Sequence, residues 1–202
     1  MLTPKHIDEL DNELSSTLAR IPVLEGCIGG SPITNGQHNK VHRLFYLDHS
    51  DYIIQSERKD GKKKSVSKVE NSIIQADAGV APACIFHDDK IAVYEFIEGS
   101  HPNATDANIV RIANTIKTIR SGPKMKGTYC PIDKMNKLRA KVKMPKHIDR
   151  HIDQIVKHLK HNMLLVPSHN DFSLLNIIDD GKKMYVIDWE FSGQAVKEWD
   201  PA

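Results

Sequence analysis

The segment from His169 to Glu190 constrains this chain more than any other part of its sequence. It begins with the residues His-Asn-Asp-Phe-Ser-Leu-Leu-Asn, continues through an apolar run at 184–187, and ends with Asp-Trp-Glu. Asp171 and Asn176 therefore fall on one loop and Asp188 on a second, adjacent loop. A carboxylate, a carboxamide and a second carboxylate are the groups that orient a hydroxyl and hold magnesium against a nucleoside triphosphate. The segment therefore predicts a phosphotransferase.

The composition is that of an ordinary globular protein. The chain has 202 residues, of which 40% are hydrophobic, which is enough for one or two units with a buried core. The formal net charge is only +2, so no overall field draws the protein to nucleic acid or to an anionic membrane. No apolar stretch reaches the ~18 residues of a membrane helix, and the first residues lack a signal-peptide core. We expect a cytoplasmic protein whose three cysteines, Cys27, Cys84 and Cys130, are reduced.

The first half of the chain is rich in predicted strands. Residues 28–36 predict a glycine-rich turn between two strands of a hairpin, and the lysine-rich segment 59–64 predicts a solvated loop. Apolar spacing predicts helices at 7–14 and 66–78, with Gly79 ending the second. The other predicted strands span 38–46, 52–55, 85–86 and 91–96.

The second half of the chain has helical periodicity instead. We expect helices at 107–119 and 148–159, and strands only at 164–166 and 184–187, so a sheet-rich half joins a helix-rich half near Glu98. His147 and His151 are four residues apart and could in principle bind zinc from one helix face. No glutamate stands between them in an HExxH pattern, so we favour a charged, solvent-facing helix.

Several motifs occur in the order expected of one fold. Residues 169–176 follow the pattern His-x-Asp-x-x-x-x-Asn, residues 187–193 are Ile-Asp-Trp-Glu-Phe-Ser-Gly, and residues 95–99 are Glu-Phe-Ile-Glu-Gly. With these motifs the chain resembles the small-molecule branch of the protein-kinase-like fold: choline/ethanolamine kinases, thiamine kinases and aminoglycoside phosphotransferases, and above all choline-kinase-like proteins of bacteria. The resemblance implies a two-lobed α+β fold. The N-lobe, residues 1–98, has an antiparallel sheet and a helix and ends at the hinge; the helical C-lobe, residues 99–202, is incomplete.

The resemblance also implies a role for each motif. Asp171 is expected to orient the substrate hydroxyl toward the γ-phosphorus of ATP, and Asn176 and Asp188 to bind one or two Mg²⁺ ions. His169 is a catalytic candidate, for which a bracing hydrogen bond is favoured over action as a base. The residues expected to bind ATP lie in the glycine-rich turn, on the third strand, in the helix and at the hinge. They are Gly29, Gly30, Thr34, Asn35, Gln55, Glu70, Glu95 and Ile97.

One position departs from the family pattern. The third strand is expected to carry a lysine or arginine that contacts the α- and β-phosphates and pairs with the helix glutamate, but Gln55 is uncharged. A charge-assisted hydrogen bond is roughly twice as strong as a neutral one. Either triphosphate affinity is reduced, or a cation comes from elsewhere, for example from Arg58 or Lys59. Glu70 is then equally compatible with a solvated helix residue.

The acceptor is expected to be a small alcohol, choline or a related amino alcohol. Aromatic faces and carboxylates attract a quaternary ammonium, and Glu190, Trp189 and Trp199 are the candidate residues, with core packing as the alternative for Trp189. Thiamine and aminoglycosides are alternative acceptors. An alternative of another class is a non-catalytic nucleotide-binding protein on a kinase-like frame. Residues 199–202 resemble the WDxA element after which family members continue into further helices, so a truncated or naturally short chain is expected.

Overall fold

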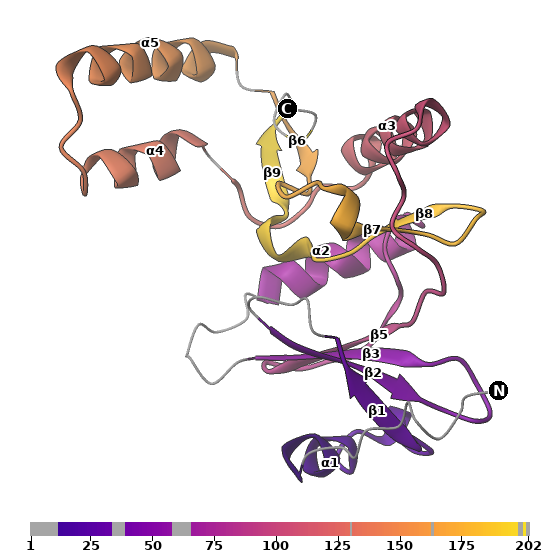
Figure 1. Cartoon of the computed structure of the whole chain (residues 1–202). Helices are drawn as coiled ribbons and strands as arrows, with labels where there is room; N and C mark the ends of the chain where they lie inside the picture. The colour runs from indigo at the N-terminus through magenta and orange to yellow at the C-terminus, as the bar shows by residue number, and fades with distance from the viewer. Residues whose placement is uncertain are drawn as a thin grey trace.

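The computed structural model describes residues 12–33, 39–57, 66–129, 131–162, 164–197 and 200 (Figure 1). The α-helices are α1 (Asn12–Leu18), α2 (Val66–Asp77), α3 (Asp106–Ser121), α4 (Pro131–Arg139) and α5 (Lys146–Asn162). The strands are β1 (Gly29–Pro32), β2 (Asn39–Phe45), β3 (Tyr52–Glu57), β4 (Cys84–His87), β5 (Ile91–Glu95), β6 (Leu165–Ser168), β7 (Ile177–Asp179), β8 (Met184–Val186) and β9 (Gly193–Val196). Three short 3-10 helices are η2 (Pro22–Leu24), η3 (Leu174–Asn176) and η4 (Trp189–Phe191).

The first half forms a five-stranded antiparallel sheet in the order β1-β2-β3-β5-β4. Its outer face carries a core in which Leu44, Ile54 and Val93 pack against Leu14 of α1 and Leu24 of η2. Because successive side chains of a strand point to opposite faces, the neighbours of Ile54 and Val93 point to the inner face of the sheet. Gln55 and Tyr94 therefore lie on the inner face.

Helix α2 lies between the inner face of the sheet and the second half of the chain, opposite α1 (Figure 1). The Ser72 hydroxyl on this helix is 3.4 Å from the Tyr94 hydroxyl on β5. Burial is the main cause that raises the pKa of Tyr94, to about 12, and the nearby negative charge of Asp188 adds to the effect. The helix ends as predicted, because Gly79 adopts a φ of 74° and donates its N–H to the Ala76 carbonyl.

A second core joins α2 and α3 to the β7–β8 hairpin. It contains Ile119 of α3, Met125, Val186 of β8 and Trp189 of η4. The hairpin is also held to the segment after β5, since Ser100 and Asp179 exchange backbone hydrogen bonds of 3.1 and 2.8 Å. A side chain at Gly99 would clash with the Asp179 carbonyl there, so this position requires glycine.

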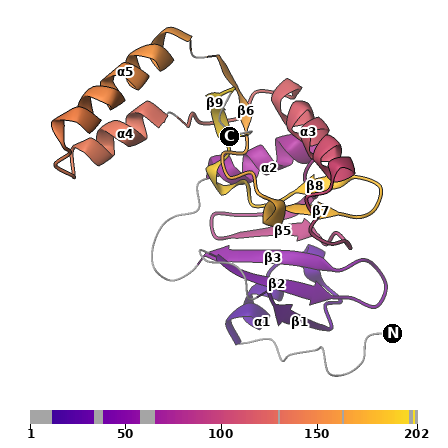
Figure 2. The ribbon, with the colours of Figure 1, turned by 45° about the horizontal axis from the view of Figure 1, so that its top comes forward.

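Helices α4 and α5 project from the rest of the molecule as a helical hairpin (Figure 2). Arg139 of α4 joins the two helices through Asp149 at 2.7 Å and Asp153 at 2.8 Å on α5. The histidine pair His147 and His151 lies in α5. No group of three or more His, Cys, Asp or Glu side chains suited to a metal ion is found within the described ranges. In the same ranges no helix is both long enough and apolar enough to cross a membrane.

Most predicted elements are confirmed, and a few elements of the structure were not predicted. The strands at 52–55, 85–86 and 91–96 and the helices at 66–78, 107–119 and 148–159 are present, with boundaries shifted by a few residues. The first described helix, α1 at Asn12–Leu18, overlaps the predicted helix 7–14 at residues 12–14 and extends further along the chain, and residues 1–11 lie outside the described part. The structure adds α4, β7 and β9, which the sequence interpretation missed. The predicted lobe boundary near Glu98 stays a prediction.

Candidate active site

Asp171 and Asn176 lie together on the loop between β6 and β7. The Asn176 side-chain amide donates to the Asp171 backbone carbonyl at 2.9 Å and to Asp171 Oδ2 at 3.2 Å. Asp171 is exposed, and Asn176 is half-buried at the end of η3. Because Asn176 uses Nδ2 for both hydrogen bonds, its Oδ1 is the oxygen that is left to bind a cation.

The β7–β8 hairpin brings Asp188 to the same end of the site. Ile177 pairs with Val186, and the next residue, Ile187, donates its N–H to the Asn176 carbonyl at 2.9 Å. Asp188 follows directly, is exposed, and has a left-handed backbone with φ 62° and ψ 59°. Aspartate is one of the few side chains that adopt this region readily. A carboxamide oxygen and a carboxylate are hard ligands of the type that Mg²⁺ prefers, so the residues present fit this ion.

His169 is a buried brace between the two loops. Its side chain is fully buried and its Nε2 donates to the Ile187 carbonyl at 2.9 Å. The ring also contacts Trp189 edge-on, with the centroids 4.7 Å apart. Burial lowers the pKa of His169, although the hydrogen bond with Ile187 opposes the effect. A neutral, buried ring that holds the loop favours the bracing role over the role of a base.

Asp200 and Asn170 hold the same loop, and the sequence interpretation missed both. The Asp200 carboxylate accepts hydrogen bonds from the backbone N–H groups of His169 at 2.8 Å and Asn170 at 2.7 Å. Asn170 has a φ of 67°, and its side-chain amide donates to the Phe191 carbonyl at 2.8 Å. The resemblance of residues 199–202 to a family element was the only sequence signal for Asp200.

The residues predicted to form the hinge differ in their hydrogen bonds. The Glu95 carboxylate accepts a hydrogen bond from the Ala83 N–H at 3.0 Å, so this side chain is engaged in the sheet. Phe96 donates its N–H to Asp51, and Arg43 stacks on its ring at 3.7 Å. Across the ranges that the structure describes, the Ile97 N–H has no hydrogen-bond acceptor.

The glycine pair lies in a strand and not in the predicted turn. Gly29 and Gly30 belong to β1 and pair with Phe45 and Leu44 of β2. The hairpin itself is as predicted, because β1 and β2 are antiparallel neighbours. The predicted phosphate ligands Thr34 and Asn35 lie outside the described residues, as does the predicted acceptor contact Trp199.

Gln55 and Glu70 are not joined through a cation on β3. Gln55 lies opposite Val41 and Ala92 in the sheet. Glu70 instead forms an ion pair of 2.5 Å with Lys126, which lies in the segment after α3. The Glu70 carboxylate thus joins α2 to the second half of the chain through an ion pair that water still reaches, and its role toward the nucleotide stays a prediction.

One of the predicted acceptor residues, Trp189, lies in the core, and a second, Glu190, lies beside a lysine. Trp189 is only 5% exposed, and its indole N–H donates to the Val186 carbonyl at 2.9 Å. The prediction that Trp189 contacts the acceptor is wrong, because the side chain belongs to the core beneath residues 187–193, the predicted metal loop. The Glu190 carboxylate lies 3.8 Å from Lys68 of α2, so a protein cation already stands beside it.

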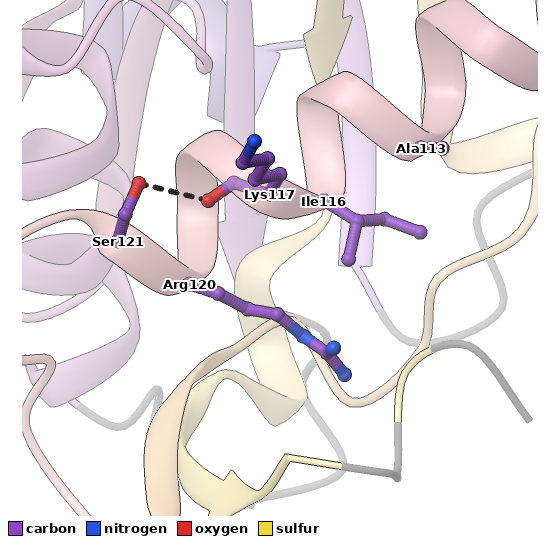
Figure 3. A pocket seen from close by; sticks show the side chains of 5 residues that line it. All are labelled: Ala113, Ile116, Lys117, Arg120 and Ser121. Carbon is purple, nitrogen blue, oxygen red and sulfur yellow. Dashed lines mark hydrogen bonds between the residues drawn. The ribbon is translucent and has the colours of Figure 1, made fainter.

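A separate hollow of about 440 Å³ lies along α3 (Figure 3). It is lined by Ala113, Ile116, Lys117, Arg120 and Ser121. Arg120 also donates to the Lys197 carbonyl. None of the predicted site residues lines this hollow, so we do not assign the nucleotide to it.

Comparison with known proteins agrees with the geometry. No protein-family profile matches the chain. The structure is similar to a choline/ethanolamine kinase family protein from Mesorhizobium loti, with a TM-score of 0.74 and 23% identity, over 94% of this chain and 68% of that chain. It is also similar to the choline kinase LicA from Streptococcus pneumoniae, with a TM-score of 0.72 and 19% identity, over 92% of this chain and 71% of that chain. This chain has the protein-kinase-like fold.

One sequence relative and several further structures are also similar to this chain. The Protein LicA homolog of Mycoplasma capricolum is 28% identical over 134 residues, which are 62% of this chain and 55% of that protein. The match thus spans about half the length of this curated relative. Aminoglycoside phosphotransferases are structural neighbours as well, with TM-scores from 0.59 to 0.66, and one of them is a complex with streptomycin and ATP. The predicted resemblance and the α+β fold class are confirmed.

Proposed function

We propose that this protein is an ATP-dependent phosphotransferase that moves the γ-phosphate to a hydroxyl of a small molecule. The observation that carries the proposal is the arrangement of three side chains from two loops. The Asn176 side chain donates to Asp171, and the Asn176 backbone carbonyl accepts the N–H of Ile187, the residue before Asp188. Phosphoryl transfer needs positioned carboxylates and charge neutralisation more than a protein nucleophile.

Each residue has a separate task in the proposed reaction. Asp171 accepts the proton of the acceptor hydroxyl, whose oxygen forms a bond to the γ-phosphorus while the bond to the β-γ bridging oxygen breaks and ADP leaves. Asn176 Oδ1 and the Asp188 carboxylate would hold Mg²⁺, which neutralises phosphate charge when bound. The Ile97 N–H would hydrogen-bond the adenine ring. His169 and Asp200 keep the loop in place.

Choline or a related amino alcohol is the acceptor that we propose. Support comes from the names of the relatives, since one structural neighbour is a choline kinase and another is a choline/ethanolamine kinase family protein. Aminoglycosides are a second candidate because phosphotransferases for these compounds have the same fold. The acceptor contacts first predicted at Trp189 do not support either choice, because that side chain is buried.

The test is an ADP-release assay with Mg-ATP and a panel of acceptors: choline, ethanolamine, thiamine and aminoglycosides. We expect release of ADP that requires both Mg²⁺ and one of the amino alcohols. Turnover with an aminoglycoside or thiamine alone would replace choline with that acceptor. Calorimetry that shows tight Mg-ATP binding without turnover for any acceptor would favour the alternative of a non-catalytic nucleotide-binding protein.

Replacement of the proposed proton acceptor tests the mechanism. We expect Asp171→Ala to lower turnover by about 10²- to 10⁴-fold, the usual contribution of general base catalysis, and to leave Mg-ATP affinity nearly unchanged. Asp89→Ala is the matched control, because Asp89 is an exposed aspartate in the β4–β5 turn. Equal loss of turnover and of nucleotide affinity in Asp171→Ala would show that the assigned role is wrong.

A further inference from the structure

Among the described residues, four of the groups assigned to the candidate site carry no positive charge for its proposed substrate. Asp171 and Asp188 each carry a carboxylate, and Asn176 and Gln55 are neutral amides. A triphosphate brings several more negative charges, and like charges a few ångströms apart repel by about 4 kcal/mol per pair at an effective dielectric of 20. Bound Mg²⁺ offsets part of this repulsion. A protein cation close to the metal loop would offset more.

Three basic side chains on the described elements around the site are already held by carboxylates. Arg43, on the inner face of the sheet, binds Asp51 through two nitrogens at 2.6 and 2.7 Å. Lys126 binds Glu70 at 2.5 Å. Arg111 of α3 forms a two-pronged ion pair with Asp179. A cation in such a short pair is poorly suited to bind a second anion.

Lys68, in the first turn of α2, differs from these residues. Its ammonium is 3.8 Å from Glu190, which is an ion-pair distance but too long for a hydrogen bond, and 5.5 Å from the centre of the Phe191 ring. Both neighbours follow Asp188 within three residues. Within the described part of the chain, Lys68 donates no hydrogen bond. Its side chain is 32% exposed, so the charge is partly shielded from water and still accessible to a ligand.

We propose that Lys68 is the phosphate-binding cation of this protein and takes the place of the cation that β3 lacks at Gln55. The inference rests on the proposed function. The three N–H donors of the Lys68 ammonium contact phosphate oxygens that lie beside Asp188, and Glu190 holds the lysine at the metal loop when no nucleotide is bound. The phosphate cation thus comes from α2, two residues before Glu70, and Glu70 serves Lys126.

Nucleotide affinity of the full chain tests this assignment without any acceptor. Dissociation constants for Mg-ATP and for adenosine are measured by calorimetry on Lys68→Met, Lys68→Arg and the wild type. We expect Lys68→Met to weaken Mg-ATP binding about tenfold, as loss of a charge-assisted hydrogen bond predicts, and to leave adenosine binding unchanged. Lys68→Arg should retain most of the affinity. A merely structural role would weaken both ligands together.

Two further variants separate the rival explanations. Lys90→Met, in the exposed β4–β5 turn, is the charge-matched control and should bind Mg-ATP normally. Adding Gln55→Lys to Lys68→Met should recover affinity by restoring a cation to β3. Loss of Mg-ATP affinity in the double variant Arg58→Met/Lys59→Met, with no loss in Lys68→Met, would overturn the assignment while the proposed function stands. A wild type that binds Mg-ATP no better than adenosine would overturn both.

Discussion

Asn71 is the residue whose replacement should most weaken the junction between α2 and the site. Its side chain is fully buried. The amide oxygen accepts a hydrogen bond from the Lys126 N–H at 2.7 Å, and the amide nitrogen donates to the Lys126 carbonyl at 3.0 Å. The same nitrogen lies 3.1 Å from the Ser192 hydroxyl and 3.3 Å from the Ser192 carbonyl. One side chain thus connects α2, the segment after α3 and the end of the metal loop.

The expected effect of Asn71→Ala follows from these contacts. The substitution leaves the Lys126 N–H without its acceptor and removes the donor shared by Lys126 and Ser192. An unsatisfied buried polar group costs about 1–3 kcal/mol, so we expect the free energy of unfolding to fall by about 2–4 kcal/mol. Asn71→Asp keeps an oxygen for the Lys126 N–H, but it turns a buried carboxylate oxygen toward the Lys126 and Ser192 carbonyls, so it should destabilise the fold at least as much as Asn71→Ala.

Urea unfolding followed by circular dichroism measures this change. Asn114→Ala is the matched control, because Asn114 is an exposed asparagine inside α3. Surface substitutions usually change stability by less than about 0.5 kcal/mol, and alanine is favourable in a helix. If Asn71→Ala and Asn114→Ala differ by less than about 0.5 kcal/mol, the hydrogen bonds of Asn71 contribute nothing net and the reasoning fails.

Two predictions concern the loop that carries Asp171. Asp200→Ala should lower the free energy of unfolding by roughly 2 kcal/mol, because two backbone N–H groups lose their acceptor. It should also lower turnover about tenfold, because Asp171 would be misplaced. Wild-type turnover in this variant would contradict the assigned bracing role. Burial lowers the pKa of His169, so as the pH falls the unfolded chain takes up a proton at a higher pH than the folded chain does. The free energy of unfolding should therefore fall as the pH drops below about 6.5, by up to about 1.4 kcal/mol per pH unit. Urea unfolding between pH 5 and 8 should show a steeper slope for the wild type than for His169→Gln; equal slopes would contradict burial of a neutral ring.

Local sequence patterns predicted the elements whose periodicity is strong. Helix α2 follows its apolar spacing and ends at a glycine, and α3 begins after Thr105, whose hydroxyl accepts the Asn108 N–H. The missed strands β7 and β9 are three and four residues long, too short for an alternating pattern to be recognised. Gly29 and Gly30 suggested a turn because glycine disfavours strands, but pairing with β2 overrides that preference.

In the candidate site, too, contacts between residues near in sequence were predictable and contacts between distant residues were not. Asp171, Asn176 and Asp188 lie within a single segment of the chain, so one hairpin is sufficient to bring them together, and the order of residues predicts it. The partners of α2 are different in kind. Glu70 and Lys126 are 56 residues apart, and Asn71 and Ser192 are 121 apart. No local pattern specifies such pairs, because they depend on how the two halves of the chain pack.

Helix α2 is therefore the element that fixes the sheet relative to the catalytic loops. On one side Ser72 meets Tyr94 of the sheet, whose inner face carries Gln55. On its other side, α2 contacts the second half of the chain: Lys68 lies beside Glu190, Glu70 pairs with Lys126, and Asn71 donates to Ser192. In the proposed function the nucleotide binds between the Ile97 N–H and Asp188, so both sets of α2 contacts would hold the two parts of its site together. The proposed phosphate cation, Lys68, lies on this helix, so the contacts of α2 would also position that cation relative to Asp188.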